Sequence, residues 1–411
     1  MTPGRGRYSL RHRQLTAGSI RTAATLARSL VAALEVAGCT RHELLRAGVI
    51  GEGDAGRKPI RRPSTQEGDR RGVVSDDDGT IGAADPAERF VGERIRRRHD
   101  QNDSAAWQNQ RTMKIGVQLP EVERVVSWLE LREMAVTAER IGLDSIWVGD
   151  HLLYRGDGQP ARGPWEAWST LAALAAVTER VEIGPLVAST SFHNPAMLAK
   201  KAATIDEISG GRLILGLGAG WNEAEYAAYG FPYDRRVSRF EEAFTIVREL
   251  LATGRCDFHG TYHELDDCEL LPRGPRPAGA PLMVGSIGER MLRITLPHVS
   301  SWNAWGAWFG NCVEGYLPLR DRIDAACLEV SRTPAEVERT LALLVAFPGS
   351  VGRRSDVSDH PFEPIRGDPA TLIPTLRAFA DAGVGHVQLV LDPITVESIA
   401  ALEPTLDALH G

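Results

Sequence analysis

From residue 113 to the C-terminus, short apolar runs alternate with longer stretches whose apolar residues recur at helical spacing. Eight runs are predicted to be strands: Ile115–Leu119, Ser145–Val148, Val181–Val187, Leu213–Leu217, Leu282–Val284, Trp302–Trp305, Leu341–Phe347 and His386–Leu391. Amphipathic helices are predicted at Leu129–Ile141, Trp165–Glu179, Ala196–Ile208, Phe240–Thr253, Tyr316–Val330 and Pro369–Ala382. Such alternation is typical of parallel strands joined by crossover helices. Eight repeats predict an α/β fold, a closed (β/α)8 TIM barrel, rather than a doubly wound open sheet, since no dinucleotide fingerprint accompanies them.

Two stretches interrupt the repeat. Residues 256–272 predict a strand-rich insertion before the fifth strand, and residues 349–367 form a polar loop with Pro and Gly after the seventh. Long loops at the C-terminal face of a barrel often form lids or substrate walls.

The first 112 residues have a different character. Apolar periodicity is confined to residues 23–50, where it predicts two short helices and weakly resembles the start of the ligand-binding domain of arabinose-regulator-type transcription factors. Residues 51–112 are rich in Arg, Asp, Gly and Ser, a composition typical of disorder. We interpret 1–112 as a low-order, Arg-rich extension, from a misassigned start or a vestigial regulator head, and 113–411 as the barrel domain.

Charge and cysteine content narrow the class of protein. Of the net charge of −7, residues 1–112 hold 20 basic and 14 acidic residues, which leaves 27 basic and 40 acidic residues for the barrel. A net acidic barrel argues against nucleic acid as its partner. Five scattered cysteines indicate a reducing compartment, and no apolar run is long enough to span a membrane. We therefore expect a cytoplasmic protein.

Candidate chemistry follows the strands, because barrel active sites lie at the C-terminal strand ends. After the second strand comes Asp150-His151, where a histidine could donate or accept a proton, or simply hold the loop. After the fourth come Gly218, Gly220, Trp221 and Asn222. The glycines let the backbone approach a ligand, and the tryptophan could stack on a ring or only pack.

The fifth and sixth strands add an anion site and an aromatic rim. Gly285-Ser286-Ile287-Gly288-Glu289-Arg290 opens a helix, whose N–H groups suit a phosphate; Arg290 could pair with that phosphate or with a carboxylate. Trp302, Asn303 and Trp305, with Trp165, predict an apolar substrate wall, although such tryptophans also occur in cores. Cys256, His259, His263 and Cys268 do not have a standard zinc spacing, and we predict no metal.

Asp206–Asn222, supported by Gly285–Arg290 and Ala382–Val390, resembles the luciferase-like family of flavin- or deazaflavin-dependent oxidoreductases. The resemblance implies a TIM barrel that uses FMN or coenzyme F-420 to transfer a hydride to, or insert oxygen into, a small hydrophobic substrate. It also implies a catalytic His151 and a cofactor held by the glycine-rich loops together with Asp150, Pro185, Leu186 and Ala188. We expect a homodimer; a cofactor-free binding barrel is the alternative.

Within that family, the deazaflavin branch carries a non-proline cis peptide bond that supports the ring, and we map it to Pro185–Leu186. The sugar-phosphate dehydrogenase branch has a glutamate acid where Trp221 stands, so that mechanism is not carried over. The Gly-Pro-Leu-Val strand favours F-420 over FMN.

Overall fold

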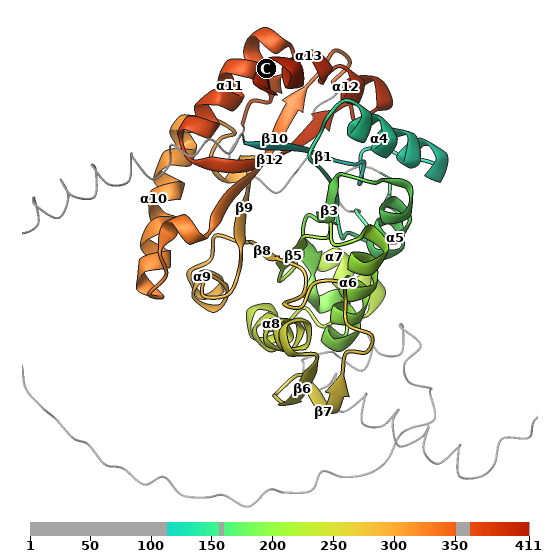
Figure 1. Ribbon diagram of the computed structural model, residues 1–411, viewed down its shortest axis with the longest axis vertical. Helices are drawn as coiled ribbons and strands as arrows, with labels where there is room; N and C mark the ends of the chain where they lie inside the picture. The colour runs from blue at the N-terminus through green and yellow to red at the C-terminus, as the bar shows by residue number, and fades with distance from the viewer. Residues whose placement is uncertain (1–112, 156–159, 351–361, 411) are drawn as a thin grey trace, which may run out of the picture. The chain divides into compact units, whose positions relative to one another are not determined.

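The computed structural model describes residues 113–155, 160–350 and 362–410 (Figure 1). The extension predicted over residues 1–112 and most of the loop predicted over 349–367 lie outside the described residues.

The main sheet consists of parallel strands. They are β1 (Lys114–Gln118), β2 (Ser145–Val148), β3 (Glu182–Pro185), β4 (Ala188–Ser189), β5 (Leu215–Gly218), β8 (Leu282–Gly285), β9 (Ser301–Trp305), β10 (Glu338–Ala346) and β12 (Val384–Asp392), with β11 (Ile365–Arg366) paired to β10. Their order is β3-β2-β1-β12-β10-β9-β8-β5-β4. Since β3 and β4 stand at opposite ends of this order but adjoin in the chain, the sheet curls into a barrel (Figure 1). The predicted TIM barrel is confirmed.

Helices follow most strands and cover the outside of the barrel (Figure 1). The α-helices are α4 (Trp128–Arg140), α5 (Ala167–Val177), α6 (Pro195–Ser209), α7 (Glu223–Tyr229), α8 (Arg236–Thr253), α9 (Glu289–Thr295), α10 (Val313–Glu329), α11 (Pro369–Asp381), α12 (Val396–Ala400) and α13 (Glu403–His410). The described residues also form the short 3-10 turns η1 (Thr190–Phe192), η2 (Gly306–Trp308) and η3 (Pro334–Glu336). No helix of the described part of the chain is long and apolar enough to span a membrane.

Local sequence signals determine where several helices begin and end. The side chains of Ser127, Asn194 and Asp368 accept N–H bonds at the first turns of α4, α6 and α11. Gly210 and Gly254 take left-handed conformations at the C-terminal ends of α6 and α8.

Asp206 of α6 fixes the approach to β5. Its carboxylate pairs with Arg276 at 2.5 Å and accepts the Leu213 N–H at 3.3 Å. Asp206 is almost fully buried, so this pair holds α6 against the chain that enters the barrel. Asp206, at the start of the Asp206–Asn222 stretch, therefore stabilises the fold.

The barrel interior has a polar floor. Ser145 Oγ of β2 lies 2.7 Å from His386 Nε2 of β12 and also accepts from Trp147 Nε1 at 2.7 Å. These strands reach each other across β1 only because residue 116 is glycine: a Cβ there would lie 1.9 Å from Ser145 Oγ. Burial lowers the pKa of His386 to about 3, so this histidine is neutral and belongs to the core.

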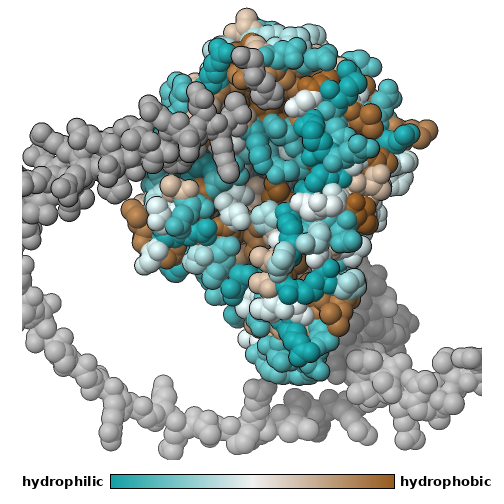
Figure 2. Space-filling view, in the orientation of Figure 1, coloured by the Kyte–Doolittle hydropathy of each residue, from teal (hydrophilic) through white to brown (hydrophobic). Residues whose placement is uncertain are grey.

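A hairpin of β6 (Arg255–His259) and β7 (Glu264–Glu269) lies between α8 and β8, within the stretch predicted as a strand-rich insertion. Figure 1 shows it below the barrel strands, and its outer surface is largely hydrophilic (Figure 2).

Candidate active site

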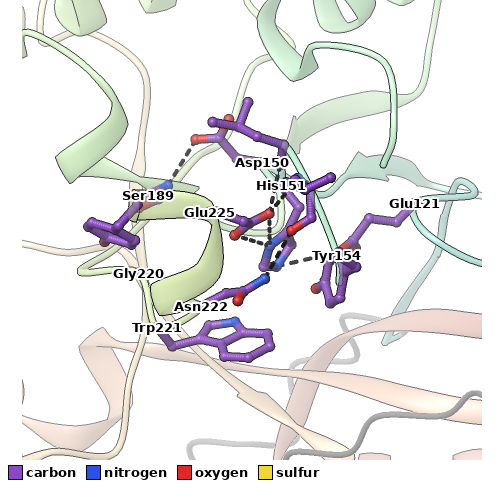
Figure 3. Close-up of polar contacts among 12 residues, drawn as sticks. Glu121, Asp150, His151, Tyr154, Ser189, Gly220, Trp221, Asn222 and Glu225 are labelled. Carbon is purple, nitrogen blue, oxygen red and sulfur yellow. Dashed lines mark hydrogen bonds and ion pairs between the residues drawn. The ribbon is translucent and has the colours of Figure 1, made fainter. Parts of the chain in front are cut away.

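His151 lies between two buried carboxylates at the C-terminal end of the strands (Figure 3). Its Nδ1 donates to the Glu225 carboxylate, 3.0 and 3.1 Å from the two oxygens, and its Nε2 lies 3.4 Å from Glu121 Oε1. Burial lowers the pKa of His151, but the charge of Glu121 and the hydrogen bond and charge of Glu225 outweigh it, so the net shift is upward. The imidazole is therefore biased toward its protonated form.

Each carboxylate is held by further donors. Glu225, in the first turn of α7, accepts the N–H groups of Leu152 and Leu153 at 2.8 and 2.9 Å. Glu121, just after β1, accepts from Gln118 Nε2 at 2.6 Å and from the Tyr154 hydroxyl at 3.1 Å. Loops after β1, β2 and β5 thus meet at one imidazole.

The glycine-rich turn after β5 is shaped by contacts that only glycine allows at residue 220. Its φ is +73°, and a Cβ would lie 2.0 Å from the Tyr226 hydroxyl. This turn places the Trp221 ring 5.6 Å from the His151 ring, and the Trp221 side chain is exposed. Asn222 Nδ2 donates to the Leu153 carbonyl at 3.1 Å, which ties this turn to the loop that carries His151.

Asp150 holds the third strand rather than facing outward. Its Oδ2 accepts the Ser189 N–H at 2.9 Å and lies 2.9 Å from His193 Nε2. Because Asp150 and Ser189 are both buried, the carboxylate anchors β4 next to the His151 loop.

The third strand breaks between β3 and β4, and the cis peptide bond is Leu186–Val187, not the expected Pro185–Leu186. Pro185 still pairs with Val148, and Leu186 N–H donates to the Val148 carbonyl, whereas Ala188 already pairs with Leu217. The third strand therefore stops pairing with β2 after residue 186 and pairs with β5 from residue 188. The cis peptide bond lies one residue later than the position expected from the sequence.

Val187 fills the space that this break opens. A Cβ at Gly218 or Gly285 would lie 2.9 or 3.1 Å from Val187 Cγ2. The strand ends of β5 and β8 therefore present bare backbone around one partly exposed apolar side chain.

The loop after β8 has its own support. Ser286 Oγ accepts the Gly288 N–H at 3.2 Å, and the Ser286 carbonyl accepts from Trp302 Nε1 at 2.7 Å. Arg290, at the start of α9, pairs with Glu241 of α8 at 2.6 Å. Arg290 was expected to pair with a phosphate, with Glu289 or with an outer carboxylate, and Glu241 is such an outer carboxylate.

The tryptophans that were expected to lie together at one rim occupy different parts of the barrel. Trp302 is fully buried and packs beneath the Ser286 loop, because β9 turns it away from the bore, so its expected place in a substrate wall is wrong. Asn303 is also buried, with Nδ2 bonded to Thr340 and Gln388 at 2.8 Å. Trp305 and Leu186 pack with Phe362 against Ala342, Leu344 and Val390.

Trp165 lies near the segment that follows β1. Its Nε1 donates to the Val126 carbonyl at 2.7 Å, and it borders a pocket of about 150 Å³ that Glu121 also lines. Among the residues that the structure describes, no three His, Cys, Asp or Glu side chains are arranged to hold a metal.

Sequence reasoning missed Glu121, Val187 and Glu225. Glu121 had a usable signal, since it directly follows the first strand at the catalytic end of the barrel. Glu225 had none, because its contact with His151 joins positions 74 residues apart.

A histidine and two carboxylates at the C-terminal end of a TIM barrel are typical of an enzyme active site. Residues 105–350 match the model of the luciferase-like monooxygenase family, and the chain belongs to that family.

Among its relatives, an F420-dependent glucose-6-phosphate dehydrogenase of Amycolatopsis mediterranei is 39% identical over 172 residues, 39% of this chain and 50% of that protein. The pyrimidine monooxygenase RutA of a Caulobacter species is 31% identical over 213 residues, 50% of this chain and 58% of that protein. The alignments thus span about half the length of these relatives. The structure of an F420-dependent secondary alcohol dehydrogenase superposes with a TM-score of 0.60 at 19% identity, over 72% of this chain and 99% of that one, which shows the shared fold.

Proposed function

We propose that this protein is an oxidoreductase that uses coenzyme F-420, or alternatively FMN, to transform a small hydrophobic organic substrate. One of its relatives is named an F420-dependent dehydrogenase, and another is named a monooxygenase. The observation that carries the proposal is His151, held between Glu121 and Glu225 beside the break in the third strand.

The residues at the break fit a flat ring. Val187 and Leu186 offer an apolar surface, while Gly218 and Gly285 leave no side chain beside them. Asp150 keeps Ala188 and Ser189 in register with β5. The Gly285–Glu289 turn, with the Ser286 hydroxyl and its N–H groups, is the expected holder of the cofactor phosphate. Gly220, Trp221 and Asn222 would border the ring from the opposite loop.

When bound, such a cofactor supplies a hydride or activates oxygen. The chain supplies the proton. Glu225 fixes His151 Nδ1, which leaves Nε2 as the nitrogen that faces Glu121. Because the pKa of His151 is raised, its protonated form is favoured, and we assign Nε2 as the proton donor; a buried carboxylate nearby stabilises the charged form.

The substrate side of the rim is apolar. Leu186, Trp305 and Phe362 pack against Ala342, Leu344 and Val390 (the apolar rim cluster). Apolar walls with few polar groups suit a small hydrophobic molecule oriented by one hydrogen bond. Together these features favour a hydrophobic substrate whose reacting oxygen or carbon meets His151.

Titration of the purified protein with oxidised F-420 and with FMN, followed by cofactor fluorescence, tests the proposal. We expect saturable binding of one cofactor, with F-420 preferred. A protein that is folded by circular dichroism but binds neither would be a cofactor-free barrel, and the proposal would fail.

The cellular setting and assembly belong to the same proposal. We expect a cytoplasmic homodimer that acts on a small molecule. Light scattering on the purified chain measures the assembly, and a monomer at all concentrations would contradict it.

A further inference from the structure

Two cysteines of the β6–β7 hairpin stand directly opposite each other. Cys256 of β6 pairs with Cys268 of β7 in the antiparallel ladder. Residues opposite each other on antiparallel strands point to the same face, with Cβ atoms about 4.5–5.5 Å apart. Both side chains belong to the apolar core beneath the hairpin, Cys256 buried and Cys268 partly exposed.

The ladder around this pair can support a covalent bond. Leu270 N–H donates to the Gly254 carbonyl at 2.8 Å, so residues 254 and 270 form a hydrogen-bonded pair. Positions two residues further along share that geometry, with Cα atoms about 5.5 Å apart. Disulfides have Cα separations of about 4.4–6.8 Å. The Cα separation therefore lies in the range of disulfides, and closure requires the two Cβ atoms to approach each other by about 1 Å.

The hairpin is also held at its tip. The Glu242 carboxylate of α8 accepts the N–H groups of Thr261, Tyr262 and His263 at 2.7, 2.8 and 3.0 Å. The register of the ladder shifts between Cys256 and Phe258, so the cysteine pair belongs to the regular base of the hairpin, while Glu242 holds the tip.

We propose that Cys256 and Cys268 form a thiol–disulfide pair, closed to a cross-strand disulfide when the protein meets a low-molecular-weight disulfide. Cys268, as a thiolate, attacks one sulfur of that compound and expels one thiol. Cys256, as a thiolate, then attacks Cys268 Sγ in the mixed disulfide and expels the second thiol. The two protein thiols are oxidised, the added disulfide is reduced to two thiols, and the two protons end on them.

The order of attack follows from the surroundings. Burial, with the nearby Glu249 carboxylate, raises the pKa of Cys256 to about 11, so few of its molecules are thiolate at neutral pH. The more exposed Cys268 reacts first, and closure by Cys256 accelerates as pH rises.

Closure ties the end of α8 to the segment that leads into β8. The loop it closes is short, and the expected rise in the melting temperature of the oxidised protein is on the order of 5 °C. The residues around His151 are not part of the hairpin, so cofactor binding should not change.

The test incubates the reduced full-length protein with oxidised glutathione, followed by intact mass and peptide mapping. We expect a joined peptide that contains residues 256 and 268 and is two hydrogen atoms lighter than the two peptides together; glutathione on Cys312, which is exposed, is counted separately. Cys256→Ser should instead gain one glutathione at residue 268, and Cys268→Ser should form no joined peptide. Cys312→Ser and Cys327→Ser, on or next to α10, serve as matched controls and should still close the pair.

Circular dichroism of each variant separates misfolding from loss of the pair, and Cys268→Ala provides a second replacement. The inference is overturned if the folded wild type keeps both thiols free to alkylation at equilibrium with excess oxidised glutathione. A joined peptide that pairs either cysteine with residue 312 would overturn it as well.

Discussion

Replacement of Glu225 by glutamine should lower the pKa of His151. The carboxylate is almost fully buried and accepts one His151 N–H and two backbone N–H groups. Glutamine keeps the size of the side chain and one acceptor oxygen, which can stay on Leu152 and Leu153. Its NH2 group would then face His151 Nδ1, so the charge-assisted bond is lost.

The magnitude follows from that one bond. A hydrogen bond to a charged group is worth about 1.5–3 kcal/mol, and one pKa unit corresponds to about 1.4 kcal/mol. We therefore expect the pKa of His151 to fall in Glu225→Gln, because that charge-assisted bond is lost. Glu121 remains and limits the fall.

Histidine ring NMR across a pH titration measures this, with the His151 signal assigned by its absence in His151→Asn. Glu242→Gln is the matched control, since Glu242 likewise accepts three N–H groups, all of them from the backbone, but does not contact His151. A His151 pKa that is unchanged or higher in Glu225→Gln would refute the assigned role of the carboxylate.

The raised pKa of His151 also makes the stability of the folded protein depend on pH. The pKa of His151 is raised above its ordinary 6.5 in the folded protein, so its stabilising contribution is complete below that value. It is lost as pH rises through the folded-state pKa. Thermal melts of wild type and Glu225→Gln should therefore differ most at low pH and converge above the folded-state pKa of His151.

Four further outcomes are expected. His151→Ala should slow cofactor reduction or reoxidation by about 10²–10⁴-fold while its binding constant stays close to wild type, as stopped-flow and titration would show; normal turnover would assign the histidine a structural role. Ser286→Ala should weaken cofactor binding by about 1–3 kcal/mol, whereas Ser238→Ala on α8 should not, and equal affinities would remove the phosphate site from this turn. Gly220→Ala should lower the melting temperature, because a Cβ would collide with Tyr226 Oη; an unchanged melt would contradict that packing. The truncated chain Met113–Gly411 should keep fold and cofactor binding, and an insoluble product would show that residues 1–112 are needed.

Local pattern was sufficient for the barrel. Each of the eight apolar runs overlaps a strand, and Ser145–Val148 coincides with β2 residue for residue. Strands and helices repeat their apolar residues with different periods, and both periods are visible in a few consecutive residues. The alternation of strands and helices can therefore be predicted without knowing which residues contact one another. The positions of His151 and of the glycine-rich turns after β5 and β8 followed from the rule that barrel sites lie at C-terminal strand ends.

Tertiary structure decided which side chains meet. Glu225 reaches His151 only because the loops after β2 and β5 converge, and Arg290 turns to Glu241 because α8 and α9 are neighbours. Trp302 and Trp305 are alike in sequence, but the two-residue period of β9 sends one into the core and the other toward the apolar rim cluster. Contacts between distant positions depend on strand register and helix packing, which a sequence does not state residue by residue.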